Sequence, residues 1–175
     1  ISGKHTFVNA RLARYYGLEE VPASGVQRME LRSDSHRSGI LTHGAILRVT
    51  ANGTNTSPVL RGVWVSERLL GVHVPPPPDN VPAIEPDIRG ATTIREQLLK
   101  HRSDAACASC HAKVDPAGFA LENFDAAGQW REFYDGRKRK NSAKIDASYQ
   151  LPDGREFADI DGFQSLIASN PSELA

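Results

Sequence analysis

The sequence has few side chains that contain sulfur. Its 175 residues include two cysteines and one methionine, and no histidine, cysteine or methionine follows His111. A structural zinc site usually needs four cysteine or histidine ligands, including a second pair at close spacing. The sequence supplies no such second pair after His111, so it does not support a zinc site.

Other absences narrow the class of protein. No apolar run is long enough to span a bilayer. Lysine plus arginine and aspartate plus glutamate both number 21, and this zero net charge does not indicate nucleic-acid binding. No serine–histidine–acid set or pair of carboxylates stands out as catalytic. The sequence begins at Ile1 without a methionine or a signal peptide, so we interpret it as a processed piece or an excised domain.

Both cysteines lie in one motif, Cys-x-x-Cys-His, over residues 107–111. This motif is the attachment signature of c-type haem. Cys107 and Cys110 can each add to a vinyl group of one porphyrin, and His111 can then serve as an axial ligand to the iron. The sequence therefore predicts one covalent haem c, anchored by Cys107 and Cys110 and ligated by His111.

Two other interpretations use the same cysteines. A thioredoxin-like redox pair lies at a helix N-terminus beside a βαβ unit, but no alternation of buried strands and helices surrounds residues 107–110. A plain disulfide between Cys107 and Cys110 leaves the adjacent histidine unexplained. The haem interpretation accounts for all three residues.

The sixth iron ligand is harder to assign. Since residues 112–175 lack methionine and histidine, this ligand comes from residues 1–106 or the position is open. His43 ranks first because it lies in an apolar run beside a glycine, although a core histidine bonded to the backbone fits equally well. His101 ranks second because it is close to Cys107 in sequence. Its ordinary interpretation is that it caps the C-terminus of its own helix. Met29 ranks third, and the remaining candidates are His5, His36 and His73.

The pattern of apolar residues predicts a mainly α chain with several short helices, long loops and a small C-terminal β-hairpin. Helices are expected over residues 5–16, 57–71, 93–101, 115–124 and 158–168. Ser57, Thr93 and Asp115 are the expected N-caps. Strands are expected over residues 26–31, 130–134 and 145–151, with turns at 51–56 and 153–154 and an extended proline strap at 75–78.

Some residues have both a haem-related and an ordinary interpretation. Trp64 and Trp130 could pack against the porphyrin, or could simply belong to the core. Arg102 and Arg131 could pair with haem propionates. The basic loop over residues 137–140 is either a solvated turn or a surface that steers an acidic redox partner.

Several stretches resemble one known family. They are Ser57-Pro58-Val59 with Arg61-Gly62, the proline strap, the haem motif, residues 115–125, residues 128–131, Ile145-Asp146-Ala147 and Leu151-Pro152-Asp153-Gly154. The family comprises the cytochrome-c-like modules of unknown function in large exported proteins of planctomycete-type bacteria. The resemblance runs from about residue 5 to residue 168 and is specific in residues 39–131. Relatives often carry a methionine where this chain has Val114, and valine cannot ligate iron.

The resemblance implies a fold, a division into modules and a role. It implies that residues 33–131 form a cytochrome-c-like haem domain. Residues 1–32 resemble the tail of a preceding module, and residues 132–175 resemble the start of a following module that packs on the haem domain. It also implies covalent haem and an exported redox role, without a defined substrate.

The expected function is electron transfer to a redox partner protein or a neighbouring cytochrome module. Because covalent haem is attached outside the bacterial cytoplasm, we expect a periplasmic or cell-surface protein. The alternative is a haem enzyme or a sensor of peroxide or a small gas, with an open sixth position. A weaker alternative is a structural or substrate-binding module of a polysaccharide-processing protein.

Overall fold

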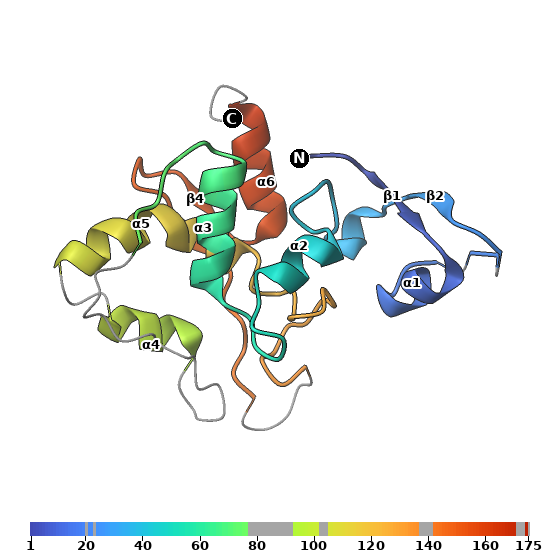
Figure 1. Cartoon of the computed structure of the whole chain (residues 1–175), viewed down its shortest axis with the longest axis horizontal. Helices are drawn as coiled ribbons and strands as arrows, with labels where there is room; N and C mark the ends of the chain where they lie inside the picture. The colour runs from blue at the N-terminus through green and yellow to red at the C-terminus, as the bar shows by residue number, and fades with distance from the viewer. Residues whose placement is uncertain are drawn as a thin grey trace.

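The computed structural model describes residues 1–19, 21–22, 24–76, 93–101, 105–136, 142–170 and 174. In this part of the chain the fold is mostly helical, with long loops and two separate antiparallel strand pairs (Figure 1). The elements are β1 (His5–Val8), α1 (Ala10–Tyr15), β2 (Gln27–Glu30), a 3-10 turn (Ser33–Ser35), α2 (Gly44–Val49), α3 (Pro58–Arg68), α4 (Ile94–His101), α5 (Ala105–Ala120), β3 (Tyr149–Gln150), β4 (Glu156–Phe157) and α6 (Ile160–Ser169). The predicted fold class is thus confirmed at the level of mainly α structure with a C-terminal hairpin.

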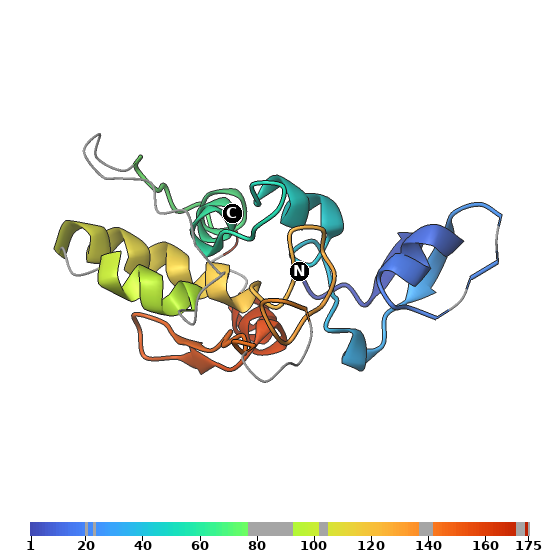
Figure 2. The ribbon, with the colours of Figure 1, turned by 90° about the horizontal axis from the view of Figure 1, so that it is seen from below.

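The N-terminal part projects away from the helices that follow it (Figures 1 and 2). In it β1 and β2 pair antiparallel, with Val8 opposite Gln27, and α1 lies between them in the chain. The predicted strand over residues 26–31 is confirmed. The predicted helix over residues 5–16 is wrong in its first half, because residues 5–8 pair with β2 and the Asn9 side chain caps a helix that begins only at Ala10.

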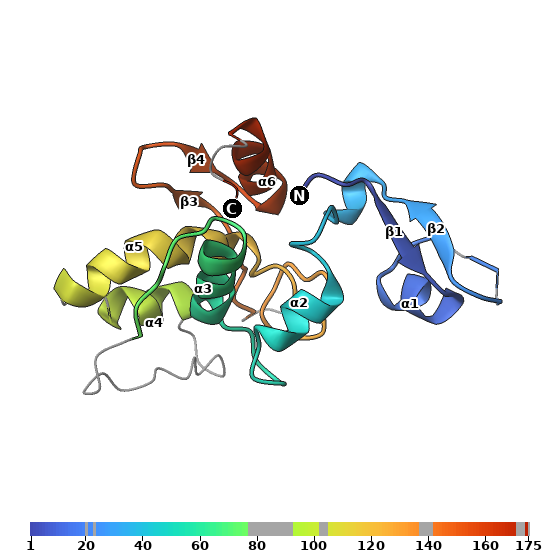
Figure 3. The same cartoon turned by 45° about the horizontal axis from the view of Figure 1, so that its top comes forward.

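The centre of the molecule is the crossing of α3 and α5 (Figures 1 and 3). Ser57 caps α3 as predicted, since its Oγ accepts the Leu60 N–H at 3.2 Å and Pro58 takes the first helical position. Two glycines allow the helices to approach closely. A Cβ added at Gly62 would lie 2.0 Å from the Val114 carbonyl oxygen, and one at Gly118 would lie 1.9 Å from that of Pro58.

The main core forms where α6 and the C-terminal hairpin pack against this crossing. Its buried side chains are Leu41, Leu47, Val65, Ala117, Ala120, Leu121, Phe124, Phe157, Ile160, Phe163 and Ile167. A second cluster holds α4 alongside α5, as Figure 2 shows, and contains Ile94, Leu98, Phe119, Tyr134 and Ile145. The capping box predicted at the start of α4 is confirmed, because Thr93 Oγ1 accepts the Glu96 N–H at 3.2 Å and Glu96 Oε2 accepts the Thr93 N–H at 2.9 Å.

The helix predicted to begin at Asp115 is wrong, and so is the N-cap role of Asp115. Both residues of the Asp115-Pro116 pair lie inside α5, which begins at Ala105 and includes the whole haem motif. Proline lacks the N–H that would bond to the preceding turn, so it usually stands at a helix start. Here Val114 and Gly118 pack on α3 on either side of Pro116, and this tertiary contact outweighs the lost hydrogen bond.

The C-terminal strands differ from those predicted. Residues 130–134 form only isolated bridges, Phe124 with Trp130 and Phe133 with Lys144. The hairpin pairs Tyr149 with Phe157 and Gln150 with Glu156, so only the end of the predicted strand over residues 145–151 is a strand. The turn at residues 153–154 and the last helix are confirmed, with Gly154 at a φ of +88° and Asp159 capping α6. In the part of the chain that the structure describes, no helix could cross a membrane.

Candidate haem attachment site

The two cysteines and His111 lie on one face of α5. Residues three and four positions apart are neighbours on a helix surface, so Cys107 is adjacent to both Cys110 and His111. Both thiols are free and partly exposed. The described strands form only antiparallel pairs, so they do not build the βαβ unit that a thioredoxin-like site needs.

The same face of α5 continues into the contact with α3. Val114 follows His111 by three positions, and Gly118 follows by seven, so all three lie on one side of the helix. The first half of α5, which carries the motif, extends beyond this crossing (Figure 3). The crossing therefore fixes the helix at its second half and leaves the cysteines accessible on its first half.

His111 is held by a carboxylate one helical turn further on. Its Nδ1 atom lies 2.8 Å from Asp115 Oδ1. Asp115 is 0% exposed and His111 is 9% exposed. A carboxylate oxygen accepts hydrogen bonds, so Nδ1 carries a proton, and in the neutral imidazole Nε2 then has the lone pair. This is the arrangement in which a histidine ligates a metal through Nε2 while its other nitrogen is held by an outer partner.

These residues fit the haem that the motif predicts. Covalent attachment needs two accessible thiols beside an imidazole that can ligate the iron, and α5 provides all three groups from one helical face. Cys107 and Cys110 would hold the macrocycle, and His111 Nε2 would ligate the iron.

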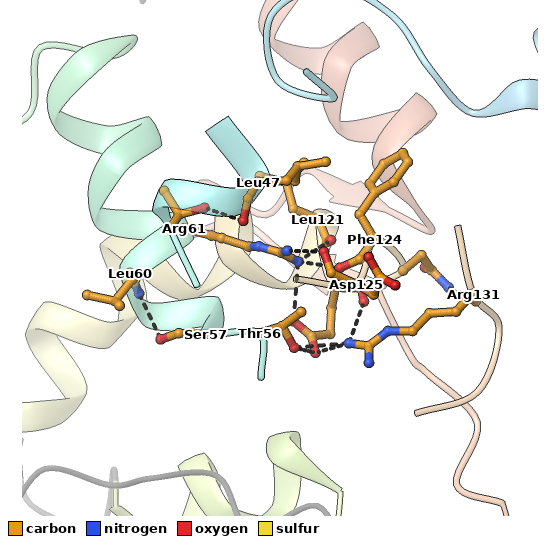
Figure 4. Close-up of polar contacts among 12 residues, drawn as sticks. Leu47, Thr56, Ser57, Leu60, Arg61, Leu121, Phe124, Asp125 and Arg131 are labelled. Atoms are coloured by element: carbon orange, nitrogen blue, oxygen red, sulfur yellow. Dashed lines mark hydrogen bonds and ion pairs between the residues drawn. The ribbon is translucent and has the colours of Figure 1, made fainter. Parts of the chain in front are cut away.

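A buried polar network fastens the far end of α5 to α3 (Figure 4). Arg61, which is 0% exposed, donates hydrogen bonds to the backbone carbonyls of Leu121 at 2.8 Å, Phe124 at 2.7 Å and Asp125 at 2.9 Å. These carbonyls lie just after the last turn of α5. One side chain of α3 thus satisfies three backbone acceptors and fixes where α5 ends.

Glu122 lies in the same network. Its Oε1 accepts hydrogen bonds from Thr56 Oγ1 and, at 3.1 Å, from Arg131 Nη2. Burial raises the pKa of Glu122, and the neighbouring guanidinium groups of Arg61 and Arg131 oppose that shift. Burial also lowers the pKa of Arg61 to about 10, against the attraction of Glu122. Arg131, predicted as a possible partner of a haem propionate, makes these contacts within the network.

The comparison with protein families matches a region that includes the motif. The model of PSCyt3, described as a protein of unknown function (DUF1588), matches residues 37–134, which is more than half of the chain. The chain belongs to the PSCyt3 family. It is therefore a cytochrome-c-like module of unknown function, as the resemblance implied. No curated protein and no solved structure matches the chain.

The matched region contains both helices of the crossing, α3 and α5. It contains α2, α3, α4 and α5, whereas β1, α1, β2 and the C-terminal hairpin with α6 lie outside it. Phe157, Phe163 and Ile167 nevertheless share the main core with residues of α3 and α5. The assignment of residues 1–32 and 132–175 to neighbouring modules stays a prediction.

The structure places His43 at the N-cap of α2, and α2 lies across α3 from the first half of α5 (Figures 1 and 3). Its side chain is exposed, and Nδ1 accepts a hydrogen bond from the Ala45 backbone N–H at 3.4 Å. α2 therefore does not lie beside the half of α5 that carries the motif. His43 as the sixth ligand stays a prediction, and the contact that it makes is that of a helix N-cap.

The other sixth-ligand candidates lie in several places. His5 and Met29 belong to the projecting strand pair, and exposed His73 follows α3, with Nδ1 at 3.9 Å from Glu67 Oε1. His36 stacks on Trp130 at 4.0 Å between ring centroids and lies 2.9 Å from Asp161. His101 ends α4, but its side chain falls outside the described residues, as do Arg102 and the loop over residues 137–140.

The two tryptophans pack with protein groups. Trp130 also meets Phe124 edge-on at 5.2 Å between ring centroids, and partly buried Trp64 packs against the main core. The ordinary interpretation as core aromatics therefore accounts for the contacts of both.

Sequence reasoning missed Asp115 as the partner of His111. The signal was present, because an acidic residue four positions after a histidine lies beside it on a helix. It was masked by the proline that follows, which suggested a helix start. The buried Arg61–Glu122 pair was also missed, since nothing local to Arg61 shows that its partners lie some 60 residues further along the chain.

Proposed function

We propose that this PSCyt3 module is a c-type cytochrome domain that transfers single electrons. One haem would be attached through Cys107 and Cys110 and ligated by His111. The observation that carries the proposal is the placement of both free thiols and a carboxylate-bonded imidazole on one face of α5. The family match supports it, because that match covers the helix with the motif and the helix that crosses it.

The haem would supply a reversible one-electron couple, and the chain would fix its position and tune it. Cys107 and Cys110 are partly exposed, so the attachment edge would be accessible to a redox partner protein or a neighbouring cytochrome module. The close α3–α5 contact at Gly62 and Gly118 restrains the helix that carries the ligand. A rigid ligand lowers the rearrangement that accompanies each electron transfer.

The proposed location follows from the chemistry of attachment. Thioether bonds to haem are made outside the bacterial cytoplasm, so the protein that contains this module would be exported. We propose a periplasmic or cell-surface location. Detection of the haem-bearing protein in the periplasmic fraction of its source cells supports this location, and its confinement to the cytoplasm contradicts it.

The positions of two sixth-ligand candidates favour a second candidate function, that of a haem enzyme or gas sensor with an open sixth position. Two of the three leading ligand candidates are His43, which caps α2, and Met29, which lies in β2, and both elements sit apart from the first half of α5 (Figures 1 and 2). An iron without a sixth protein ligand binds carbon monoxide or reacts with peroxide directly.

Optical spectra of the purified protein in the ferric and ferrous states separate the two candidates. Electron transfer predicts a low-spin spectrum in both states, a reversible one-electron titration and slow or absent carbon monoxide binding. A high-spin iron that binds carbon monoxide at once contradicts electron transfer and supports the second candidate. A Ser57→Ala variant, which loses only the N-cap of α3, shows whether a small loss of stability by itself changes these spectra.

A further inference from the structure

The carboxylate of Asp115 has no role in attachment, yet it is among the most buried polar groups of the chain. It is 0% exposed, and its Oδ1 lies 2.8 Å from Nδ1 of His111. A buried carboxylate pays a high desolvation cost unless it accepts hydrogen bonds. A charge-assisted hydrogen bond from an imidazole N–H partly offsets that cost and is stronger than a bond between neutral groups.

The position of this carboxylate is set by the fold. Asp115 stands one turn after His111 on the same helix and directly after Val114, whose backbone packs against Gly62 of α3. The hydrogen bond therefore does not depend on a mobile loop. Its geometry is maintained by the helix and by the helix crossing together.

We propose that Asp115 is the positioning residue that sets the donor strength of His111 and thereby lowers the reduction potential of the attached haem. The inference rests on the proposed function, because it requires iron at His111 Nε2. By accepting the Nδ1–H bond, the carboxylate selects the tautomer with the lone pair on Nε2 and increases electron density on the ring.

The consequence is a preference for the oxidised iron. A stronger donor stabilises the ferric state more than the ferrous state, because the ferric iron carries the greater positive charge. The change of state adds one electron, which the redox partner supplies, and no covalent bond of the chain forms or breaks. Asp115 thus acts through His111.

The test compares Asp115→Asn with Asp115→Glu and with Asp153→Asn. Asparagine removes the charge, glutamate keeps a carboxylate, and Asp153→Asn makes the same charge change at an exposed turn where Asp153 pairs with Arg155. Intact mass first establishes whether each protein carries covalent haem. Potentiometric titration then measures the ratio of ferrous to ferric haem at one fixed solution potential.

We expect Asp115→Asn to raise that ratio about tenfold, in line with the effect of losing an outer hydrogen-bond partner. For a one-electron couple, tenfold corresponds to about 59 mV. Asp115→Glu should stay closer to the wild type than Asp115→Asn does, and Asp153→Asn should not differ from it. An unchanged ratio in a haem-loaded Asp115→Asn protein overturns the inference and leaves the proposed function intact. A wild-type protein without covalent haem overturns the proposed function itself.

A measurement on the wild-type protein keeps the inference testable if Asp115→Asn does not fold. Infrared difference spectroscopy between the ferric and ferrous states reports the ring vibration of the iron-bound histidine and needs no added ligand. A carboxylate-bonded Nδ1–H predicts a frequency different from that of haem ligated by imidazole in water. A frequency equal to the imidazole value overturns the inference.

Discussion

At the scale of single residues, His43 accepts a hydrogen bond from the first turn of α2. The Ala45 N–H reaches Nδ1 at 3.4 Å, which is long for a hydrogen bond and therefore weak. We expect His43→Ala to lower the free energy of unfolding by about 0.5 kcal/mol. If His43 is also the sixth ligand, as its sequence context predicts, the same change should shift the visible spectrum of the haem-loaded protein toward high spin. Chemical denaturation and absorption spectra measure the two effects.

The control for this variant is Ser57→Ala, which removes the N-cap of α3 and leaves every histidine in place. It should cost about 1 kcal/mol without a spectral change. If His43→Ala, but not Ser57→Ala, converts the iron to a high-spin form that binds carbon monoxide, the prediction that His43 is the sixth ligand is confirmed. If both variants keep the native spectrum, that prediction is wrong.

The attachment residues were predictable from sequence, whereas their surroundings were not. Cys107, Cys110 and His111 form a motif within five consecutive residues, so no knowledge of the fold is needed to group them. Asp115 is only four positions away, but its role depends on a helix that continues through Pro116. Local preference favoured a break there, and tertiary packing on α3 reversed it.

At the scale of elements, the close crossing of α3 and α5 depends on the absence of side chains at two glycines. A methyl group at Gly62 would meet the Val114 carbonyl oxygen at 2.0 Å, so the backbones must separate to admit it. We expect Gly62→Ala to destabilise the fold by about 1–3 kcal/mol, the usual cost of overpacking. Thermal and urea denaturation measure the loss.

Gly3→Ala is the matched control for the helix crossing. The nearest atom to an added Cβ there is the Gly39 Cα at 3.9 Å, so this variant should differ from the wild type by less than about 0.5 kcal/mol. Equal stabilities of Gly62→Ala and Gly3→Ala would show that the helices do not approach as closely as the structure indicates.

The helices were easier to predict than the strands. Ser57-Pro58 and the Thr93/Glu96 pair set the starts of α3 and α4, because capping is a local interaction. Residues 5–8 and 130–134 were assigned wrongly because their state depends on partners elsewhere in the chain. The apolar residues of 5–16 fit a helix until the pairing of His5–Val8 with Gln27–Glu30 is known.

At the scale of the whole molecule, Arg61 joins segments that are far apart in the sequence. Its guanidinium bonds three carbonyls after α5 and lies 3.8 Å from the buried carboxylate of Glu122. We expect Arg61→Ala to lower the free energy of unfolding by about 3–5 kcal/mol, because it leaves buried acceptors without a donor. Denaturant titration measures this change.

Arg155→Ala is the control for the loss of an arginine. Arg155 pairs with Asp153 at the surface, so its removal should cost at most about 1 kcal/mol. If the two variants are equally stable, the buried network does not fasten α3 to α5, and the account of how α5 is held is wrong.

The same scale concerns the boundaries of the module. The resemblance placed them at residues 32 and 131 and implied that residues 132–175 pack on the haem domain, and these boundaries stay predictions. The main core combines Val65 of α3 and Leu121 with Phe163 and Ile167 of α6. Which segments share a core depends on long-range packing, and no local motif encodes it.

The central claim is that haem is covalently bound at Cys107 and Cys110, and peptide-level mass spectrometry tests it most directly. After expression with a haem-attachment system, the intact protein should exceed the mass of its 175 residues by one haem. The tryptic peptide that contains both cysteines should carry that mass, and a double Cys107→Ser and Cys110→Ser variant should lack it. An intact mass equal to that of the bare polypeptide, with both thiols free to react with an alkylating reagent, would contradict the account.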